Sequence, residues 1–335
     1  MENFTVPKDY HAELNLHDTQ VAIKTVKDFF QQTLAQRLNL LRVSAPLFVD
    51  PKSGLNDNLN GVERPVSFDI KNMTNTAEIV HSLAKWKRYA LKKYGFSEGE
   101  GLYTDMTAIR RDEDLDNIHS VYVDQWDWEK IISKENRTVD TLKEVVRTIY
   151  KVLRKTEKYM AIQYDYIEEI LPKDIFFITT QELLDLYPDC TPKEREYKIT
   201  KEKGAVFLMK IGKTLSNGER HDGRAPDYDD WELNGDILVY YPVLDIALEL
   251  TSMGIRVDEE SLDRQLSISG CDDRRELDFQ KAVLNKELPY TIGGGIGQSR
   301  ICMFFLRKAH IGEVQSSIWD QETIDTCKAA GVALL

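Results

Sequence analysis

The sequence predicts an α+β fold in which an antiparallel β-sheet is flanked by helices. Segments typical of strands follow one another at hairpin spacing, at 101–129 and at 236–257, without the strict strand–helix alternation of a parallel sheet. The chain carries no internal repeat, low-complexity tract or flexible linker. We therefore expect one folded domain over residues 18–335, preceded by an N-terminal arm at residues 1–17.

The first helix and the first strand are predicted from periodicity and composition. Apolar residues recur three or four positions apart over 19–38, which indicates one face of a helix with Asp18 or Thr19 as its N-cap. The segment 41–49 has the composition of a strand. Because Pro46 cannot donate a hydrogen bond to a neighbouring strand, this strand should lie at the edge of a sheet.

The later elements follow from the same signals. Two capping boxes, Thr179 with Glu182 and Thr191 with Glu194, mark the starts of two helices. The other expected elements are a helix at 78–93, two strands and a charged loop at 101–129, a long helix at 139–162, a buried strand at 205–212, two strands with a turn at 236–257, helical structure at 259–287, and a glycine loop that leads into a helix from residue 291.

The composition argues against several classes of function. Acidic residues outnumber basic ones by 56 to 44, and the net charge of −12 argues against an extended nucleic-acid partner. No apolar run approaches the roughly 18 residues of a membrane span, and the first residues lack the layout of a signal peptide. The four cysteines are scattered, as expected for free thiols. We therefore expect a cytoplasmic protein with no membrane or nucleic-acid partner.

The segment SVYVDQWDWE predicts a strand with polar residues on one face. Alternation places Gln125 and Asp127 on one side, and Trp126 and Trp128 on the other. A buried Gln or Asp needs hydrogen-bond partners, so this face is either the floor of a polar pocket or an exposed strand end. Arg110 ends the preceding strand, where its guanidinium could clamp a phosphate or remain a surface charge.

Asp236 and Glu249 are candidates for a metal site. A turn centred near Pro242 and Val243 would bring the two carboxylates opposite one another, which is unfavourable unless a cation lies between them. Mg²⁺ is typically held by one or two carboxylates together with substrate phosphates. In a shifted register one carboxylate would instead point to water, and this alternative stays open.

Three other segments have both a functional and a structural interpretation. IGGGIGQSR (292–300) predicts a glycine loop before a helix N-terminus that favours anions, with Arg300 on the first turn, although it could be a simple turn. It matches neither a Walker loop nor a dinucleotide fingerprint. RHDGRAPDYDDW (220–231) is either a solvated loop or a carboxylate-rich loop that recognises an amine. HSLAKWKR (81–88) is either an exposed helix face or an anion-binding rim.

The order of these features resembles the three signature motifs of class II aminoacyl-tRNA synthetases. The segment 45–47 resembles the dimer-forming first motif, Arg110 the arginine of the second motif, and 295–300 the third motif. From about residue 21 to the C-terminus, the chain further resembles the ammonia-dependent asparagine synthetases of bacteria. The strings that carry this resemblance are HSLAKWKR, GEGLYTDMTAIRRDEDLDNIHSVYVDQWDWE, GRAPDYDDW, LNGDILV, ELTSMGIRV and TIGGGIGQSR.

The resemblance implies a class II-like catalytic domain, a homodimer with one active site per subunit, ATP as co-substrate and Mg²⁺ as cofactor. The residues that it implies are Arg110, Ser120, Val123, Glu249, Ser252, Arg256 and Arg300 for ATP; Asp236 and Glu249 for magnesium; Asp57, Ser82, Lys87, Gln125 and Asp127 for aspartate; and Asp57, Arg110, Gln125, Asp127, Asp229 and Arg300 for catalysis.

The implied reaction has two steps. ATP would activate the β-carboxylate of aspartate as β-aspartyl-AMP with release of pyrophosphate, and ammonia would then form asparagine and AMP. Asp57 or Asp229 is expected to take the ammonium proton. Glutamine-using synthetases carry a thiol-bearing half, whereas no cysteine follows Met1 here, so we expect free ammonia as the nitrogen source.

Two other functions are weighed against this one. A tRNA synthetase, or a paralogue that activates aspartate for another acceptor, is disfavoured because the chain is acidic and nothing in it resembles a separate basic anticodon-binding barrel. A non-catalytic regulatory paralogue is disfavoured because such relatives usually lose the motif arginines or the metal carboxylates, which this sequence retains at Arg110, Asp236, Glu249 and Arg300.

Overall fold

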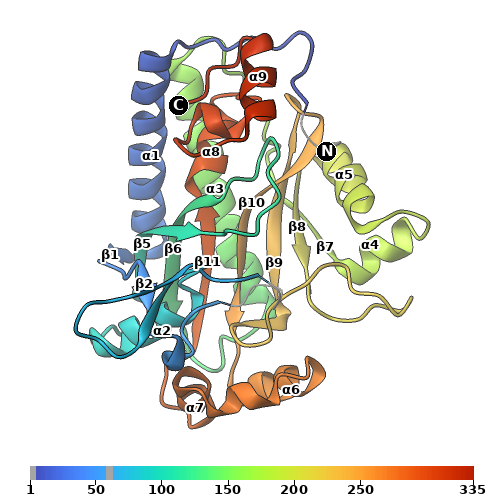
Figure 1. Cartoon of the computed structure of the whole chain (residues 1–335). Coiled ribbons are helices and arrows are strands. Elements are labelled where there is room, and N and C mark those ends of the chain that lie inside the picture. The colour runs from blue at the N-terminus through green and yellow to red at the C-terminus, as the bar shows by residue number, and fades with distance from the viewer. Residues whose placement is uncertain (1–4, 58–62) are drawn as a thin grey trace.

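The computed structural model describes residues 5–57 and 63–335, and within them an eight-stranded sheet forms the centre of the molecule (Figure 1). The five inner strand pairings are antiparallel, and the outermost pairing at each edge is parallel. The predicted α+β class and the mainly antiparallel sheet are confirmed. In order across the sheet, the strands are β1 (Leu40–Arg42), β5 (Gly101–Ile109), β6 (Tyr122–Ile131), β11 (Thr291–Gly297), β10 (Ile246–Arg256), β9 (Asp229–Tyr241), β8 (Ala205–Met209) and β7 (Phe176–Thr179).

A second sheet in the described residues has the order β2 (Phe48–Val49), β4 (Thr76–Ile79) and β3 (Ser67–Asp69). The single strand predicted over 41–49 is therefore wrong, because the chain forms β1 and β2 on either side of Pro46, in different sheets. Both are edge strands, as the proline predicted. The helix expected at 78–93 is also shorter, α2 (Ala84–Lys93), because β4 pairs with β2 and β3 instead.

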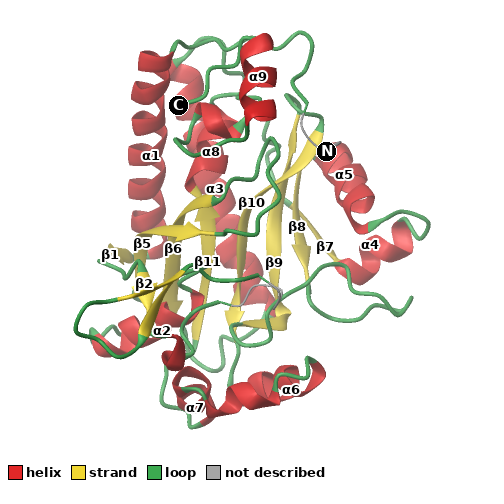
Figure 2. Cartoon of the chain, in the orientation of Figure 1, coloured by secondary structure: helices red, strands yellow, loops and turns green. Residues whose placement is uncertain are grey.

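Helices cover one face of the large sheet (Figure 2). The helices α1 (Leu16–Leu38), α3 (Val139–Gln163) and α8 (Gln298–Phe305) share a buried apolar core with β6. Phe30 of α1 stacks on Trp126 of β6, with ring centroids 4.8 Å apart. The helix α1 begins earlier than predicted, because its N-cap is Asn15, whose side chain accepts a hydrogen bond from the amide of Asp18.

Two of the remaining helices, α4 (Thr180–Leu186) and α5 (Pro192–Lys203), pack on the opposite face of the sheet, against β7, β8 and β9. Both predicted capping boxes are confirmed, at the starts of α4 and α5. The helical segment expected at 259–287 divides into two α-helices and a 3₁₀-helix. The other bounds are α6 (Glu259–Ile268), η2 (Asp272–Glu276), α7 (Asp278–Leu284) and α9 (Gln321–Ala329), with the short 3₁₀-helices η1 (Pro51–Ser53) and η3 (Ile311–Glu313).

The glycine run predicted as a loop forms β11, a central strand, so that prediction is wrong. Its neighbours β6 and β10 approach so closely that side chains would not fit. A Cβ at Gly293 would collide with the Glu129 carboxylate, and one at Gly294 would lie 2.6 Å from Met253 Cβ. The glycines thus serve close packing between strands. The helix α8 follows at once, and Arg300 lies on its first turn, as predicted.

Residues 5–14 precede α1 and form neither helix nor strand, and the first four residues of the predicted arm lie outside the described part of the chain. The division into an arm at 1–17 and a domain at 18–335 remains a prediction. None of the helices in the described ranges is long and apolar enough to cross a membrane.

Candidate active site

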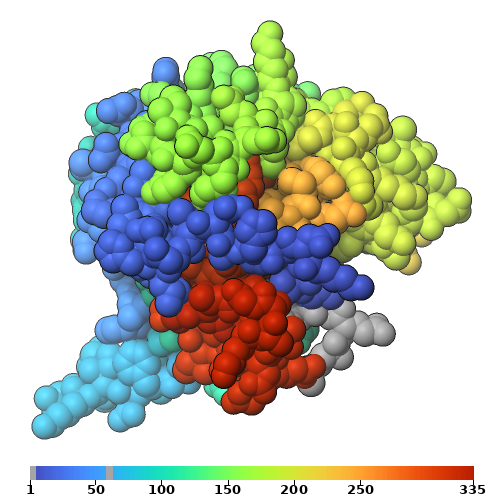
Figure 3. Space-filling view, turned by 90° about the horizontal axis from the view of Figure 1, so that it is seen from above, coloured from blue at the N-terminus to red at the C-terminus, as the bar shows by residue number. Residues whose placement is uncertain are grey.

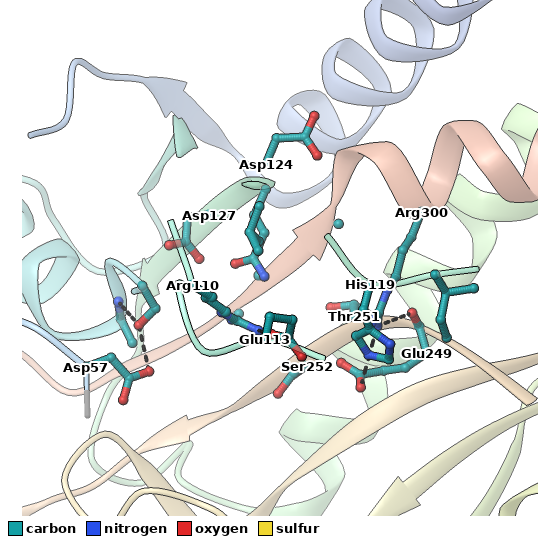
Figure 4. A pocket seen from close by; sticks show the side chains of 18 of the residues that line it. Asp57, Arg110, Glu113, His119, Asp124, Asp127, Glu249, Thr251, Ser252 and Arg300 are labelled. Atoms are coloured by element: carbon teal, nitrogen blue, oxygen red, sulfur yellow. Dashed lines mark hydrogen bonds and ion pairs between the residues drawn. The ribbon is translucent and has the colours of Figure 1, made fainter. Parts of the chain in front are cut away.

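A cavity of about 590 Å³ lies over β6, β10 and β11 (Figure 4). Gln125 and Asp127 line it, whereas Trp126 and Trp128 are buried in the core beneath the helices. The prediction that strand alternation would build a polar pocket floor is confirmed. In Figure 4, Asp57 and Asp127 lie toward one end of the cavity, and Glu249 and Arg300 toward the other.

The two motif arginines lie at this cavity. Arg110 follows β5 directly, and its Nη1 lies 3.8 Å from the carboxylate of Glu113. Arg300 donates from Nη1 to the backbone oxygen of Glu249 at 3.1 Å. Ser120, Val123 and Ser252 also line the cavity. The structure therefore brings together in one cleft the residues that the sequence predicted for the nucleotide, Arg256 included.

The predicted register of the two acidic strands is wrong. Glu249 lies opposite Leu238 because the turn, which joins Tyr241 to Ile246, is centred one residue later than predicted. A β-bulge at Leu250 then shifts the pairing by one further residue, so that Asp236 lies opposite Ser252. The two carboxylates nevertheless lie close enough to influence one another. Burial raises the pKa of Asp236 to about 7, an effect that Arg224 opposes and Glu249 reinforces.

Arg224 is a site residue that the sequence analysis did not single out. Its guanidinium donates from Nη2 to Asp236 Oδ1 at 2.7 Å and from Nη1 to Ser252 Oγ at 2.5 Å. Because Arg224 lies over Asp236, Arg224 lines the cavity and Asp236 does not. The only signal in the sequence was the presence of two arginines in the acidic segment 220–231.

The residues around Asp236 fit a magnesium ion that is shared with phosphates. The described residues contain no group of three or more His, Cys, Asp and Glu side chains able to hold a metal by themselves. Two neighbouring carboxylates are instead the usual protein share of a Mg²⁺ site completed by phosphate oxygens. The Arg224 guanidinium already forms an ion pair with Asp236, so this position attracts positive charge.

Residues predicted for the amino acid gather at the other end of the cavity. Ser82 donates to Asp57 Oδ2 at 2.9 Å, and Asp57 is buried. Lys87 donates to Asp127 Oδ1 at 2.9 Å and to the Gly294 oxygen at 3.2 Å. Lys87 is fully buried behind Asp127 and does not line the cavity. It therefore acts on this end through Asp127.

Arg256 lies with the amino-acid residues and not with Arg300. Its guanidinium contacts Glu129 through Nε and Nη2 and Asp229 Oδ1 through Nη1, at 2.5–3.1 Å. Burial opposes ionisation of Glu129, but Arg256 and Lys87 hold its pKa below the usual value. The sequence analysis missed Glu129, although strand alternation places it on the same face as Asp127.

Comparison with known proteins shows the family of this chain. A family model described as aspartate–ammonia ligase matches residues 17–331. The aspartate–ammonia ligase of Ruminiclostridium cellulolyticum is 64% identical and that of Clostridium perfringens strain SM101 is 65% identical, and each match covers 100% of both chains.

A solved structure shows the same fold. Asparaginyl-tRNA synthetase from Entamoeba histolytica, in complex with asparaginyl-adenylate, aligns with a TM-score of 0.64 at 11% identity over 90% of this chain and 66% of that longer chain. The fold is thus that of a class II synthetase catalytic domain. Together with the family match and the near-identical length of the relatives, this shows that the chain belongs to the aspartate–ammonia ligase family.

Proposed function

We propose that this protein joins aspartate and ammonia to give asparagine, with conversion of ATP to AMP and pyrophosphate. The observation that carries the proposal is one cleft lined by both motif arginines, with Arg300 at one end, Asp57, Ser82 and Asp127 at the other, and Arg110 between them. A triphosphate and an amino acid bound end to end in this cleft would meet in its middle. The names of the curated relatives support the same overall reaction.

The first step needs positive charge around a phosphate. The β-carboxylate of aspartate is a poor electrophile, so it must first become a mixed anhydride with AMP. Its attack on the α-phosphorus is opposed by the negative phosphate oxygens, and fixed guanidinium groups are most effective when they stabilise the charge of the transition state. Arg110 and Arg300 are placed for this role, with Ser120 and Val123 beside the nucleotide.

Asp236 and Glu249 would hold Mg²⁺ together with phosphate oxygens. The ion would supply further neutralisation of the triphosphate charge. Before nucleotide binds, Arg224 offsets the charge of Asp236, so it must give up this contact when the ion arrives. Ser252, which accepts from the same guanidinium, would then become available to the nucleotide.

The opposite end would orient aspartate. Asp127 and Gln125 can accept from the α-ammonium group, while the buried cations Lys87 and Arg256 favour a carboxylate nearby. Binding both substrates in fixed positions converts the attack into an effectively intramolecular step. The β-carboxylate would then point toward the nucleotide.

The second step needs a base for ammonium. Asp229 is poorly suited, because the Arg256 guanidinium holds its Oδ1. Both aspartates line the cavity, and Asp57 accepts from the Ser82 hydroxyl, so Asp57 is the better candidate to bind ammonium and take its proton. Asp229 would instead hold Arg256 in place.

Two copies of the chain would pair through the edge formed by β1 and the smaller sheet. An edge strand offers unpaired backbone groups, and exposed apolar side chains gather on the same part of the chain. These side chains are Leu41, Leu47, Phe48, Phe68 and Met73. Sedimentation of the variant Leu41→Asp with Phe48→Asp should give a monomer if the homodimer uses this edge, whereas an unchanged dimer would exclude it.

The four cysteines, all within the described residues, are free, which fits the reducing cytoplasm that we propose as the location.

The reaction is tested with purified enzyme, aspartate, Mg²⁺ and ATP. Ammonium, glutamine and tRNA are each added in separate assays. Asparagine, AMP and pyrophosphate should form with ammonium alone. Charged tRNA, or equal asparagine from glutamine without ammonium, would overturn the proposal.

A further inference from the structure

The loop between β5 and β6, residues 110–121, forms one wall of the cavity and carries Arg110, Ile118, His119 and Ser120 into its lining. Part of its shape is local. Asp116 Oδ1 accepts from the amides of Ile118 and His119, each at 2.7 Å, and its Oδ2 lies 2.8 Å from His119 Nδ1. Such a turn holds its own geometry but does not fix where the whole loop lies.

Asn117 connects this loop to two distant segments. Its Nδ2 donates to the backbone oxygens of Thr5 and Ala309, each at 2.8 Å, and its Oδ1 accepts from the Thr5 amide at 3.1 Å. Its backbone oxygen accepts from Ile311 N at 2.8 Å. The side-chain amide of Asn117 thus pairs with the backbone of Thr5 as another peptide group would. Asn117 is only 7% exposed.

The N-terminal arm is held at a second point. Tyr10 donates its hydroxyl to both carboxylate oxygens of Glu313, at 3.0 and 2.8 Å. Glu313 also accepts from the amides of Ala309 and His310. Seen from above, the dark blue N-terminal segment lies against the red C-terminal segment (Figure 3). The arm therefore ties the β5–β6 loop to the segment 309–313.

Leu115 and Ile118 pack against the core, and Ser120 donates to Ser317 Oγ at 2.9 Å, but a second cavity lies behind the middle of the loop. This cavity of about 460 Å³ is lined by Thr5, Asn117, Tyr197 and Ile246 among others, and it shares Ile118 and Lys193 with the main cavity. The loop is thus a thin wall between two cavities. Close-packed neighbours would normally fix such a wall. Here the buried hydrogen bonds of Asn117 have to supply that constraint.

We propose that Asn117 and the N-terminal arm position the nucleotide-binding wall of the active site, and that they do so without touching substrate. This inference rests on the proposed function, because it takes the 110–121 loop to be the ATP wall. Asn117 does not line the main cavity, so it is a positioning residue. Loss of its contact to Thr5 should weaken ATP binding and leave aspartate binding, at the other end of the cleft, nearly unchanged.

The test uses the full-length enzyme and a matched pair of variants at one position. Thr5→Pro removes the amide that donates to Asn117, whereas Thr5→Ala keeps both backbone contacts. Asn117→Ala removes the side-chain contacts from the other side. Aspartate-dependent ATP–pyrophosphate exchange gives KM for ATP, KM for aspartate and kcat, and thermal unfolding reports on stability.

We expect Thr5→Pro, which loses one hydrogen bond, to raise KM for ATP about tenfold, and Asn117→Ala, which loses three, to raise it by at least as much. KM for aspartate and kcat should stay within about twofold of the wild type. Thr5→Ala should match the wild type. Unchanged KM for ATP in Thr5→Pro overturns the inference. An equal loss of affinity for ATP and for aspartate, together with a lowered Tm, would also overturn the inference, because it would show general destabilisation. Should Asn117→Ala fail to fold, Thr5→Pro decides alone. Absence of exchange in the wild type would instead refute the proposed function.

Discussion

Arg224 donates from Nη2 to Asp236 Oδ1 at 2.7 Å, which places an internal cation on a carboxylate that we propose as a magnesium ligand. A guanidinium group and a divalent ion cannot occupy the same position against one carboxylate. Binding of Mg²⁺ with ATP therefore requires Arg224 to move, and the segment 220–231 that carries it should respond to nucleotide.

Replacement of Arg224 by Gln should increase the affinity of the empty site for divalent ions. The variant removes a competing cation and leaves Asp236 without its ion-pair partner, so we expect Mn²⁺ to bind about tenfold more tightly without nucleotide. Arg224→Lys, which keeps a cation, is the control. Calorimetry at slightly alkaline pH measures the affinities. Equal values for the wild type and both variants would show that Arg224 does not compete with the metal.

Affinity for Mg–ATP should rise with pH around neutrality. Burial raises the pKa of Asp236 to about 7, so the carboxyl is largely protonated below that pH. A metal ligand must be deprotonated, so affinity should fall by about tenfold for each pH unit below 7 and level off above it. Asp236→Asn should bind more weakly with a flatter profile, which separates this effect from titration of the nucleotide. A wild-type profile as flat as that of the variant would argue against this role of Asp236.

Alanine should be tolerated at Gly297 but not at Gly294. A Cβ at Gly294 would lie 2.6 Å from Met253 Cβ and from the Ser252 oxygen, whereas the nearest atom at Gly297 is Arg300 Cβ at 3.4 Å. Because β11 is confined between β6 and β10, Gly294→Ala should lower the free energy of unfolding by about 1–3 kcal/mol. Gly297→Ala should stay within about 0.5 kcal/mol of the wild type. Urea unfolding compares the two, and equal losses would contradict the packing argument.

Asp57→Asn and Asp229→Asn should have different effects on the two half-reactions. Asn at 57 can still accept from Ser82 but cannot take a proton, so ATP–pyrophosphate exchange should persist while asparagine formation falls about 100-fold or more. Asn at 229 leaves the buried Arg256 with one carboxylate fewer and should impair exchange as well. Loss of exchange in Asp57→Asn to the same degree as amide formation would remove Asp57 from the base role.

Local sequence patterns were sufficient to predict features that depend on a single strand or a single helix. The period of a strand put Gln125 and Asp127 on the pocket side and Trp126 in the core, whatever the neighbouring strands do. The capping box of Thr179 with Glu182 likewise depends only on residues within one turn. Such features need no knowledge of the rest of the chain.

Features that depend on contacts between distant segments could not be predicted in this way. The position of the turn after Tyr241 and the bulge at Leu250 together offset Asp236 from Glu249, and no local signal marks the bulge. The run from Gly293 is a strand because it pairs with β6 on one side and β10 on the other. The position of Arg224 likewise depends on a carboxylate in another strand. These outcomes are set by tertiary packing.

In the proposed reaction, the β-carboxylate of aspartate attacks the α-phosphorus of ATP. The fate of the carboxylate oxygen is measured by mass spectrometry of the products after aspartate labelled with oxygen-18 in its β-carboxylate is incubated with enzyme, Mg²⁺, ATP and ammonium. Adenylate formation predicts a labelled oxygen in AMP, with pyrophosphate unlabelled. Label in inorganic phosphate, with ADP as the other product, would instead establish an acyl-phosphate intermediate and contradict it.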